Sequence, residues 1–210
     1  NTPFPDFNEP IAKSAIAFVL FLRFVLSFGF YAFNALLASS LSLSHAGPWL
    51  LASIGSVCGV GELVAVQISC LLGMRGQCEP GKLYWSSAAS VASVALKVVA
   101  LSRLSAFLVS STGSFISSAI LLLSLFVSIL AATLLSDLQS RVVSHFVHAE
   151  GQPGILNLEG AADALAGIAG PLYTRSMLTH HGPGAAMAGI FNLYVLMHFF
   201  VHLGLSRIIT

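Results

Sequence analysis

The stretch FVLSFGFYAFNALLASSLSLSHAGPWLLASIGSVCGVG, which runs from Phe24 to Gly61, contains no Asp, Glu, Lys or Arg. A second stretch, Leu104–Ser136, also lacks these four residue types. Each is far longer than the roughly 18 apolar residues that indicate a helix able to cross a bilayer. A backbone in hydrocarbon must satisfy its hydrogen bonds internally, and neither stretch alternates as barrel strands do. We therefore expect an all-α membrane protein.

The composition of the whole chain agrees with that expectation. Of its 210 residues, 56% are hydrophobic and only 8% are charged, whereas soluble domains carry about 25% charged residues. A water-soluble fold of this composition would expose very large apolar patches. The net charge of +1 and the lack of a basic stripe argue against nucleic acid as a partner. We therefore expect the chain to be surrounded by membrane lipid.

Apolar runs separated by polar residues or by Gly and Pro predict a single transmembrane domain over residues 1–210 with six spans. The expected spans are 11–37, 49–72, 83–105, 114–136, 155–178 and 185–207. Residues 137–152 are expected to form an amphipathic connector, followed by a break at Pro153-Gly154. The chain starts with Asn1 rather than Met, so we expect a targeting segment, a domain or other residues before it.

The distribution of Lys and Arg near the span ends predicts the orientation of this multi-pass protein. One side receives Lys13, Arg75, Lys82, Arg141 and Arg207, and the other receives Arg103 and Arg175. Because cytoplasmic loops carry the excess of positive charge, both termini are expected on the cytoplasmic side or its organellar equivalent.

Small residues at four-residue spacing mark the expected helix contacts. The second span carries Gly55-x-x-x-Gly59, and the fifth carries Ala162, Ala166 and Gly170 on one stripe. Apolar helices in lipid associate by close approach of such small residues. The sequence therefore predicts tight packing there, and such stripes also allow helices to rock.

Three ionisable residues, Arg23, Glu62 and Lys97, lie within apolar spans, where each costs roughly 2.5–3.5 kcal/mol on insertion. At 1.5 Å per residue, Glu62 lies roughly 18 Å, Arg23 roughly 21 Å and Lys97 roughly 12 Å from the outer ends of their spans. Asn34 and Gln67 add polar groups on the first two spans. One interpretation is a substrate or proton-coupling site in which Glu62 is held by Arg23 or Lys97. The other is a static ion pair that locks the helices together.

No motif for enzymatic chemistry is visible in the sequence, and no cofactor or metal is expected. Gly-x-Ser-x-Gly, a phosphate-binding Gly-rich loop before a helix and His-Glu-x-x-His are all missing. His198 and His202 lie four residues apart on one helix face. No third ligand accompanies them, so packing is the preferred interpretation.

The most specific stretch joins the predicted connector to the fifth span: SHFVHAEGQPG over residues 144–154, Asn157, Gly160, and AGIAGPL over residues 166–172. It resembles the start of the eleventh helix of the major facilitator superfamily, and the drug and tetracycline-efflux branch is most similar. The pair Gly170-Pro171 would loosen this helix, and its small face would let it rock. The loop 73–82 keeps Gly73, Arg75 and Gly76 of the family's cytoplasmic motif but lacks its Asp before the Arg.

The resemblance covers nearly the whole chain and implies the C-terminal six-helix half of such a transporter. It implies a secondary transporter, not an enzyme, that moves a small organic solute or drug by alternating access. Because these proteins work as two six-helix halves, a second half or other membrane subunits are expected partners. The alternative is a structural or accessory multi-pass subunit of a larger membrane complex, in a plasma or an organellar membrane.

Overall fold

The computed structural model describes residues 10–44, 48–73, 111–146 and 152–208, together with residues 88, 91, 92 and 95. All of these residues are helical except His181, which lies in a turn. The five helices of this part of the chain are α1 (Pro10–Ser44), α2 (Pro48–Gly73), α4 (Ser111–Phe146), α5 (Gln152–His180) and α6 (Gly182–Ile208). The prediction of an all-α protein is confirmed.

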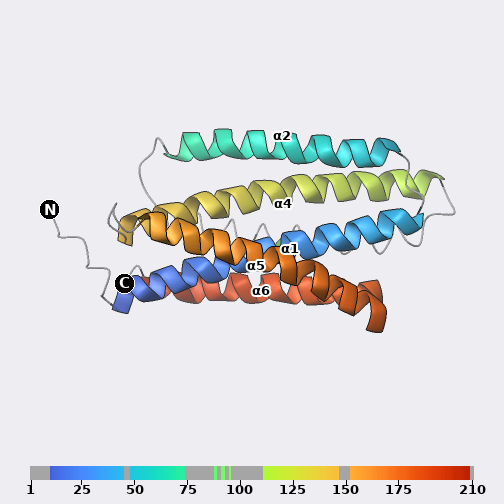
Figure 1. Cartoon of the computed structure of the whole chain (residues 1–210). Coiled ribbons are helices and arrows are strands. Elements are labelled where there is room, and N and C mark those ends of the chain that lie inside the picture. The colour runs from blue at the N-terminus through green and yellow to red at the C-terminus, as the bar shows by residue number, and fades with distance from the viewer. Residues whose placement is uncertain are drawn as a thin grey trace.

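The helices lie side by side along a common direction (Figure 1). α1 and α5 run the same way, and α2, α4 and α6 run the opposite way (Figure 1). α2 therefore ends at the end of the bundle where α1 begins, whereas α4 begins at the other end. The third expected span, 83–105, falls outside the described residues except at positions 88, 91, 92 and 95, which are helical.

The ends of α4 and α5 differ in part from the predicted boundaries. α4 continues through the expected connector to Phe146, so most of residues 137–152 is helix. Pro153-Gly154 does not break a helix but lies in the first turn of α5, where a missing amide hydrogen costs nothing. α5 closes with a hydrogen bond from His181 N to Met177 O at 2.8 Å. Gly182 then adopts a φ of 81°, which a residue without a side chain tolerates best.

α1 is the central helix and packs against α4, α5 and α6, whereas α2 packs against α4. One buried cluster joins α1 to α6 through Leu22, Val25, Leu26, Ile190 and Met197. A second cluster joins α1, α4 and α6, and its buried members are Phe33, Leu36, Leu37, Leu121, Leu125, Ala186 and Met187. The site described below lies on the side of α1 that meets α5.

Two tyrosine rings occupy notches left by glycines on neighbouring helices. The ring of Tyr194 of α6 fills the space at Gly29 of α1, and that of Tyr173 of α5 fills the space at Gly189 of α6. The Tyr194 hydroxyl donates to Leu26 O at 3.4 Å, and the Tyr173 hydroxyl donates to Ala186 O at 3.3 Å. Each contact connects two helices of the group α1, α5 and α6.

Two helices of the described part are long and apolar enough to cross a membrane, namely α1 over Ile16–Ser39 and α6 over Gly182–Leu203. α2 and α4 contain shorter apolar stretches, Ala52–Ile68 and Ser118–Leu134. Length and composition thus suggest a membrane protein. Large apolar side chains also lie on the outside of the bundle, because Leu63, Leu71 and Ile168 are 63–69% exposed.

Candidate functional site

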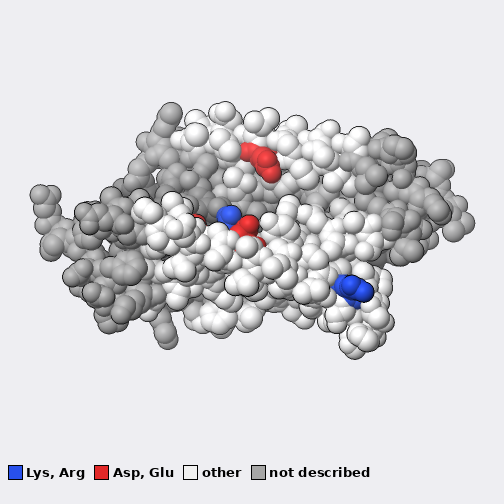
Figure 2. All heavy atoms as spheres, viewed as in Figure 1, with Lys and Arg blue, Asp and Glu red and all other residues white. Residues whose placement is uncertain are grey.

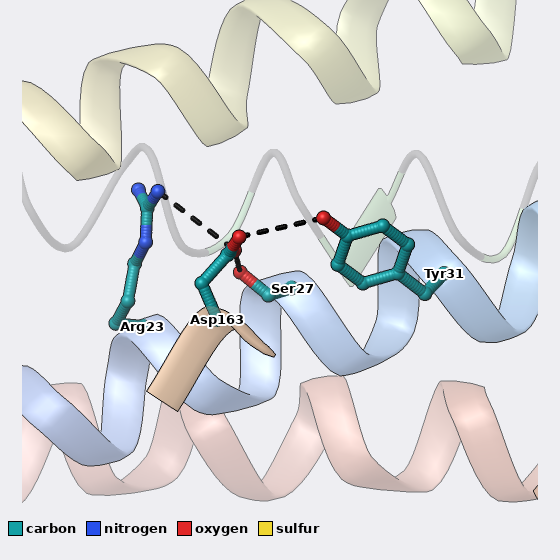
Figure 3. Close-up of polar contacts among 4 residues, drawn as sticks. All are labelled: Arg23, Ser27, Tyr31 and Asp163. Carbon is teal, nitrogen blue, oxygen red and sulfur yellow. Dashed lines mark hydrogen bonds and ion pairs between the residues drawn. The ribbon is translucent and has the colours of Figure 1, made fainter. Parts of the chain in front are cut away.

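Asp163 of α5 is the centre of a polar cluster between two largely apolar helices (Figure 3). Its Oδ1 atom accepts a hydrogen bond from the Ser27 hydroxyl and lies 3.8 Å from Nη2 of Arg23. Its Oδ2 atom accepts a longer hydrogen bond, 3.4 Å, from the Tyr31 hydroxyl. One carboxylate therefore contacts one cation and two hydroxyl groups, all of which belong to α1.

The spacing of the three α1 residues explains why they meet one carboxylate. Arg23, Ser27 and Tyr31 follow one another at intervals of four residues, which places them along one side of a helix. Figure 3 shows the three side chains projecting from the same side of α1 toward Asp163. Asn34 extends this polar stripe by a further turn, and its side chain is exposed.

The small face of α5 brings Asp163 close enough to α1 for these contacts. Ala166 is completely buried. A Cβ atom at Gly170 would lie 2.8 Å from Ala32 N and 3.0 Å from Phe28 O, so the two backbones nearly touch there. One turn further, the Thr174 hydroxyl donates to Ala32 O at 2.9 Å. Pro171 lies next to this contact with its side chain exposed, and α5 continues through it.

The Thr174→Val variant should lose this interhelical hydrogen bond while keeping the shape of the side chain. We expect the free energy of unfolding to fall by about 0.6–1 kcal/mol, because the buried Ala32 carbonyl keeps its helical partner but loses its second donor. Thermal unfolding in detergent would measure the change. Thr179→Val is the matched control, since Thr179 is exposed and its hydroxyl bonds to Arg175 O within its own helix; an equal loss in both variants would contradict the expectation.

Both ions of the cluster remain partly accessible. The side chains of Arg23 and Asp163 are each 33% exposed. Figure 2 shows positive and negative atoms next to one another near the middle of an otherwise mostly uncharged face. Neither charge is therefore sealed inside the bundle.

The other predicted site residues do not join this cluster in the described contacts. Glu62 and Gln67 have exposed side chains on α2, and Lys97 lies outside the described residues. The sequence suggested Glu62 as the carboxylate near Arg23, but the structure places Asp163 there. Figure 2 shows negative atoms over α2 on the same face as the central charges.

Helix register indicates the level of Glu62 in the bundle. A Cβ atom at the preceding residue, Gly61, would lie 3.3 Å from Cγ2 of Ile129 in α4. Leu125, one turn before Ile129, packs in the same cluster as Phe33 of α1, which runs in the opposite direction. Four residues of α4 separate Leu125 from Ile129, which corresponds to about 6 Å along the helix. Because α4 is antiparallel to α1, Ile129 lies about 6 Å from the level of Phe33, in the direction of Arg23. Glu62, the residue after Gly61, is therefore about level with Gly29, between Ser27 and Tyr31.

The glycine contact predicted on α2 is not made among the described residues. Gly55 and Gly59 are exposed, and within the described part of the chain no atom lies within 4 Å of a Cβ built on either. The α2–α4 contact uses Gly61 instead, which is buried. Gly55 and Gly59 lie on a different side of α2 from Gly61, and that side does not face α4.

Asp163 was missed by the sequence analysis although a signal was present. It is a carboxylate inside the fifth expected span, as costly there as the three residues that were singled out. The surrounding Ala and Gly residues directed attention to helix packing. The pattern Arg23, Ser27, Tyr31 was also readable as a polar stripe in an apolar helix.

The described residues contain no group of three or more His, Cys, Asp or Glu side chains close enough to hold a metal ion. His198 is half-buried and His202 is exposed on α6. Comparisons with protein-family models, with curated proteins and with solved structures found no match. The polar cluster is therefore the main indication of function.

Proposed function

We propose that this chain is a multi-pass membrane protein that works as a secondary transporter, or as its C-terminal six-helix half. It would move a small organic solute by alternating access in the manner of the major facilitator superfamily. The observation that carries the proposal is the ion pair between Arg23 and Asp163, which lies in the middle of apolar helices and stays accessible.

The depth of the cluster supports a transport site. Ser27 lies eleven residues from Ile16, the start of the apolar stretch of α1, which corresponds to about 17 Å at 1.5 Å per residue. That stretch has 24 residues, so Ser27 is close to its middle. Ionised groups at this depth are costly and commonly belong to substrate or ion pathways, and secondary transporters bind their substrates near the midplane.

The arrangement of the helices supports six crossings. α2 ends and α4 begins at opposite ends of the bundle (Figure 1), and the four described residues between them are helical. Val91 among them packs against the cluster shared by α1 and α6. The exposed apolar side chains of α2 and α5 would contact lipid or a second six-helix half.

A flux experiment tests this function. The protein is extracted in mild detergent, in whatever assembly it forms, and reconstituted into vesicles loaded with a mixture of small organic solutes. We expect counterflow of at least one solute that protein-free vesicles do not show. Extraction in a stable complex with other membrane proteins, without flux of any solute, would contradict transport and favour the accessory-subunit alternative.

The Glu62→Gln variant tests whether the carboxylate on α2 takes part. We expect the flux to fall by about tenfold or more, because Glu62 lies level with the cluster and loses its charge and its capacity to carry a proton. Glu159→Gln is the matched control on α5. Equal flux in wild type and Glu62→Gln would exclude a role of Glu62 in coupling.

A further inference from the structure

We propose that Arg175 of α5, together with His180 and His181 at the turn between α5 and α6, binds the headgroup of an anionic phospholipid. The Arg175 guanidinium would contact the lipid phosphate, and the two imidazole rings would donate to oxygen atoms of the headgroup. The proposal uses the membrane placement of the function proposed above but does not depend on transport.

Arg175 lies inside the apolar zone, less than two turns from the end of the bundle. It precedes His181 in the turn by six residues, which corresponds to about 9 Å along α5. The neighbouring helix gives a similar depth. The Thr174 hydroxyl bonds to Ala32 O, and Ala32 lies seven residues, or about 10 Å, before Ser39, where the apolar stretch of α1 ends. An arginine at this depth extends its charged end toward the membrane surface while its stem lies along apolar groups.

The side chain of Arg175 forms no ion pair with a carboxylate among the described residues. It is exposed on the outside of α5. The backbone carbonyl of Arg175 accepts a hydrogen bond from the Thr179 hydroxyl at 2.8 Å, which leaves the charge of the guanidinium uncompensated. A charged group near hydrocarbon is costly without a counter-ion, so a partner from outside the described helices is expected.

This end of the bundle offers no carboxylate among its described residues. α1 and α5 end there, and α2, α4 and α6 begin there (Figure 1). The stretches Phe24–Gly61 and Leu104–Ser136 contain no acidic residue, and none follows Asp163, which precedes Arg175 by twelve residues, or about 18 Å along α5. Figure 2 shows positive atoms near the end of α5 without negative atoms beside them on the described part of that face.

An anionic phospholipid supplies the missing negative charge. Its phosphate lies at the membrane surface, toward which the Arg175 side chain extends, and the fork of a guanidinium matches two phosphate oxygens. The phosphate of phosphatidylcholine already has a choline cation in the same headgroup, whereas that of phosphatidylglycerol has none. Charge complementarity therefore favours an anionic lipid over a zwitterionic one.

The turn provides further donors at the level of the headgroup. His180 and His181 are both exposed, and their ring centroids lie 6.3 Å apart. Each imidazole carries at least one N–H group that can donate to a lipid oxygen. α6 begins at Gly182, and the first amides of a helix have no partner within it and favour a negative charge. These groups add to the contact that Arg175 makes.

Two photoactivatable lipids test the proposal on the purified full chain in nanodiscs. Phosphatidylglycerol and phosphatidylcholine each carry the same photoreactive group in the upper part of one acyl chain, and peptide mass spectrometry after illumination measures the labelling of the α5–α6 turn. We expect phosphatidylglycerol to label the turn about fivefold more than phosphatidylcholine, as one cation near the membrane surface would give. Equal labelling by the two lipids, or labelling by neither, would overturn the proposal.

Variants assign the preference to Arg175. Arg175→Gln should lower the ratio of the two labels to about one, whereas Arg175→Lys keeps the charge and should retain a ratio above that of the glutamine variant. Thr179→Val is the matched control one turn away, because the Thr179 hydroxyl bonds within its own helix, and it should label like wild type. An unchanged ratio in Arg175→Gln would overturn the proposal. Labelling requires no flux, so failure of this site and failure of the transport function are distinguishable.

Discussion

The Asp163→Ala variant is expected to lose about 1–3 kcal/mol of stability, because it removes the acceptor of Ser27 and Tyr31 and the counter-ion of Arg23. It should also abolish solute flux. The double variant Arg23→Met/Asp163→Leu should recover most of the stability, since apolar residues of similar size can replace an interior ion pair. Flux should stay absent. Thermal unfolding in detergent and counterflow in vesicles measure the two quantities separately.

This pair of variants decides between the two interpretations that the sequence left open. A static lock predicts that stability and activity return together in the apolar double variant, because only the connection between helices matters. A binding site predicts that stability returns alone. Glu159→Gln, a carboxylate change one turn earlier on α5, should alter neither quantity. Full flux in the double variant would contradict a functional role of the charges.

The Gly170→Val variant is expected to separate α1 from α5 and to cost about 3 kcal/mol or more. The new Cβ would lie 2.8 Å from Ala32 N and 3.0 Å from Phe28 O, and backbone atoms cannot move aside as the end of a side chain can. Overpacking alone typically costs 1–3 kcal/mol, and the displacement would also stretch the Thr174 hydrogen bond and the Asp163 cluster. The yield of folded protein and its melting temperature in detergent give the measurement.

Gly160→Val is the control for that variant. Gly160 lies on the same helix, ten residues earlier, and among the described residues nothing lies within 4 Å of a Cβ built there. The same substitution should therefore leave stability nearly unchanged, since a valine costs little in helix propensity relative to glycine. A comparable loss at both positions would show that the close approach at Gly170 does not hold the helices together.

The helical class and the helix positions could be predicted because they depend on local composition. Uncharged runs require helices, and five of the six expected ranges coincide with described helices within a few residues, apart from the continuation of α1 to Ser44 and of α4 to Phe146. The range 83–105 and its Lys97 lie outside the described residues apart from four positions. The length of the apolar runs and the spacing of the residues that break them were sufficient to predict the helices.

The partner of Arg23 could not be predicted because it depends on which helices become neighbours. The sequence placed Glu62 and Arg23 at similar depths in the membrane. Depth does not show which side of its helix a residue occupies or which helices lie beside it. The close α1–α5 contact, which Gly170 and Ala166 allow, places Asp163 beside Arg23. For the same reason the contact of Gly61 with α4 could not be predicted.

The tyrosine rings in the notches at Gly29 and Gly189 restrict how the protein can move. A ring seated in a neighbour's notch blocks piston-like sliding, because a shift by one residue would drive the ring into a side chain. α1, α5 and α6 therefore keep their axial register and would travel together, with Arg23 and Asp163 fixed inside that block. α2 packs against α4 and lies outside that block. A conformational cycle would then tilt helices outside the block against it, which changes what covers the charged pair and leaves the pair itself intact.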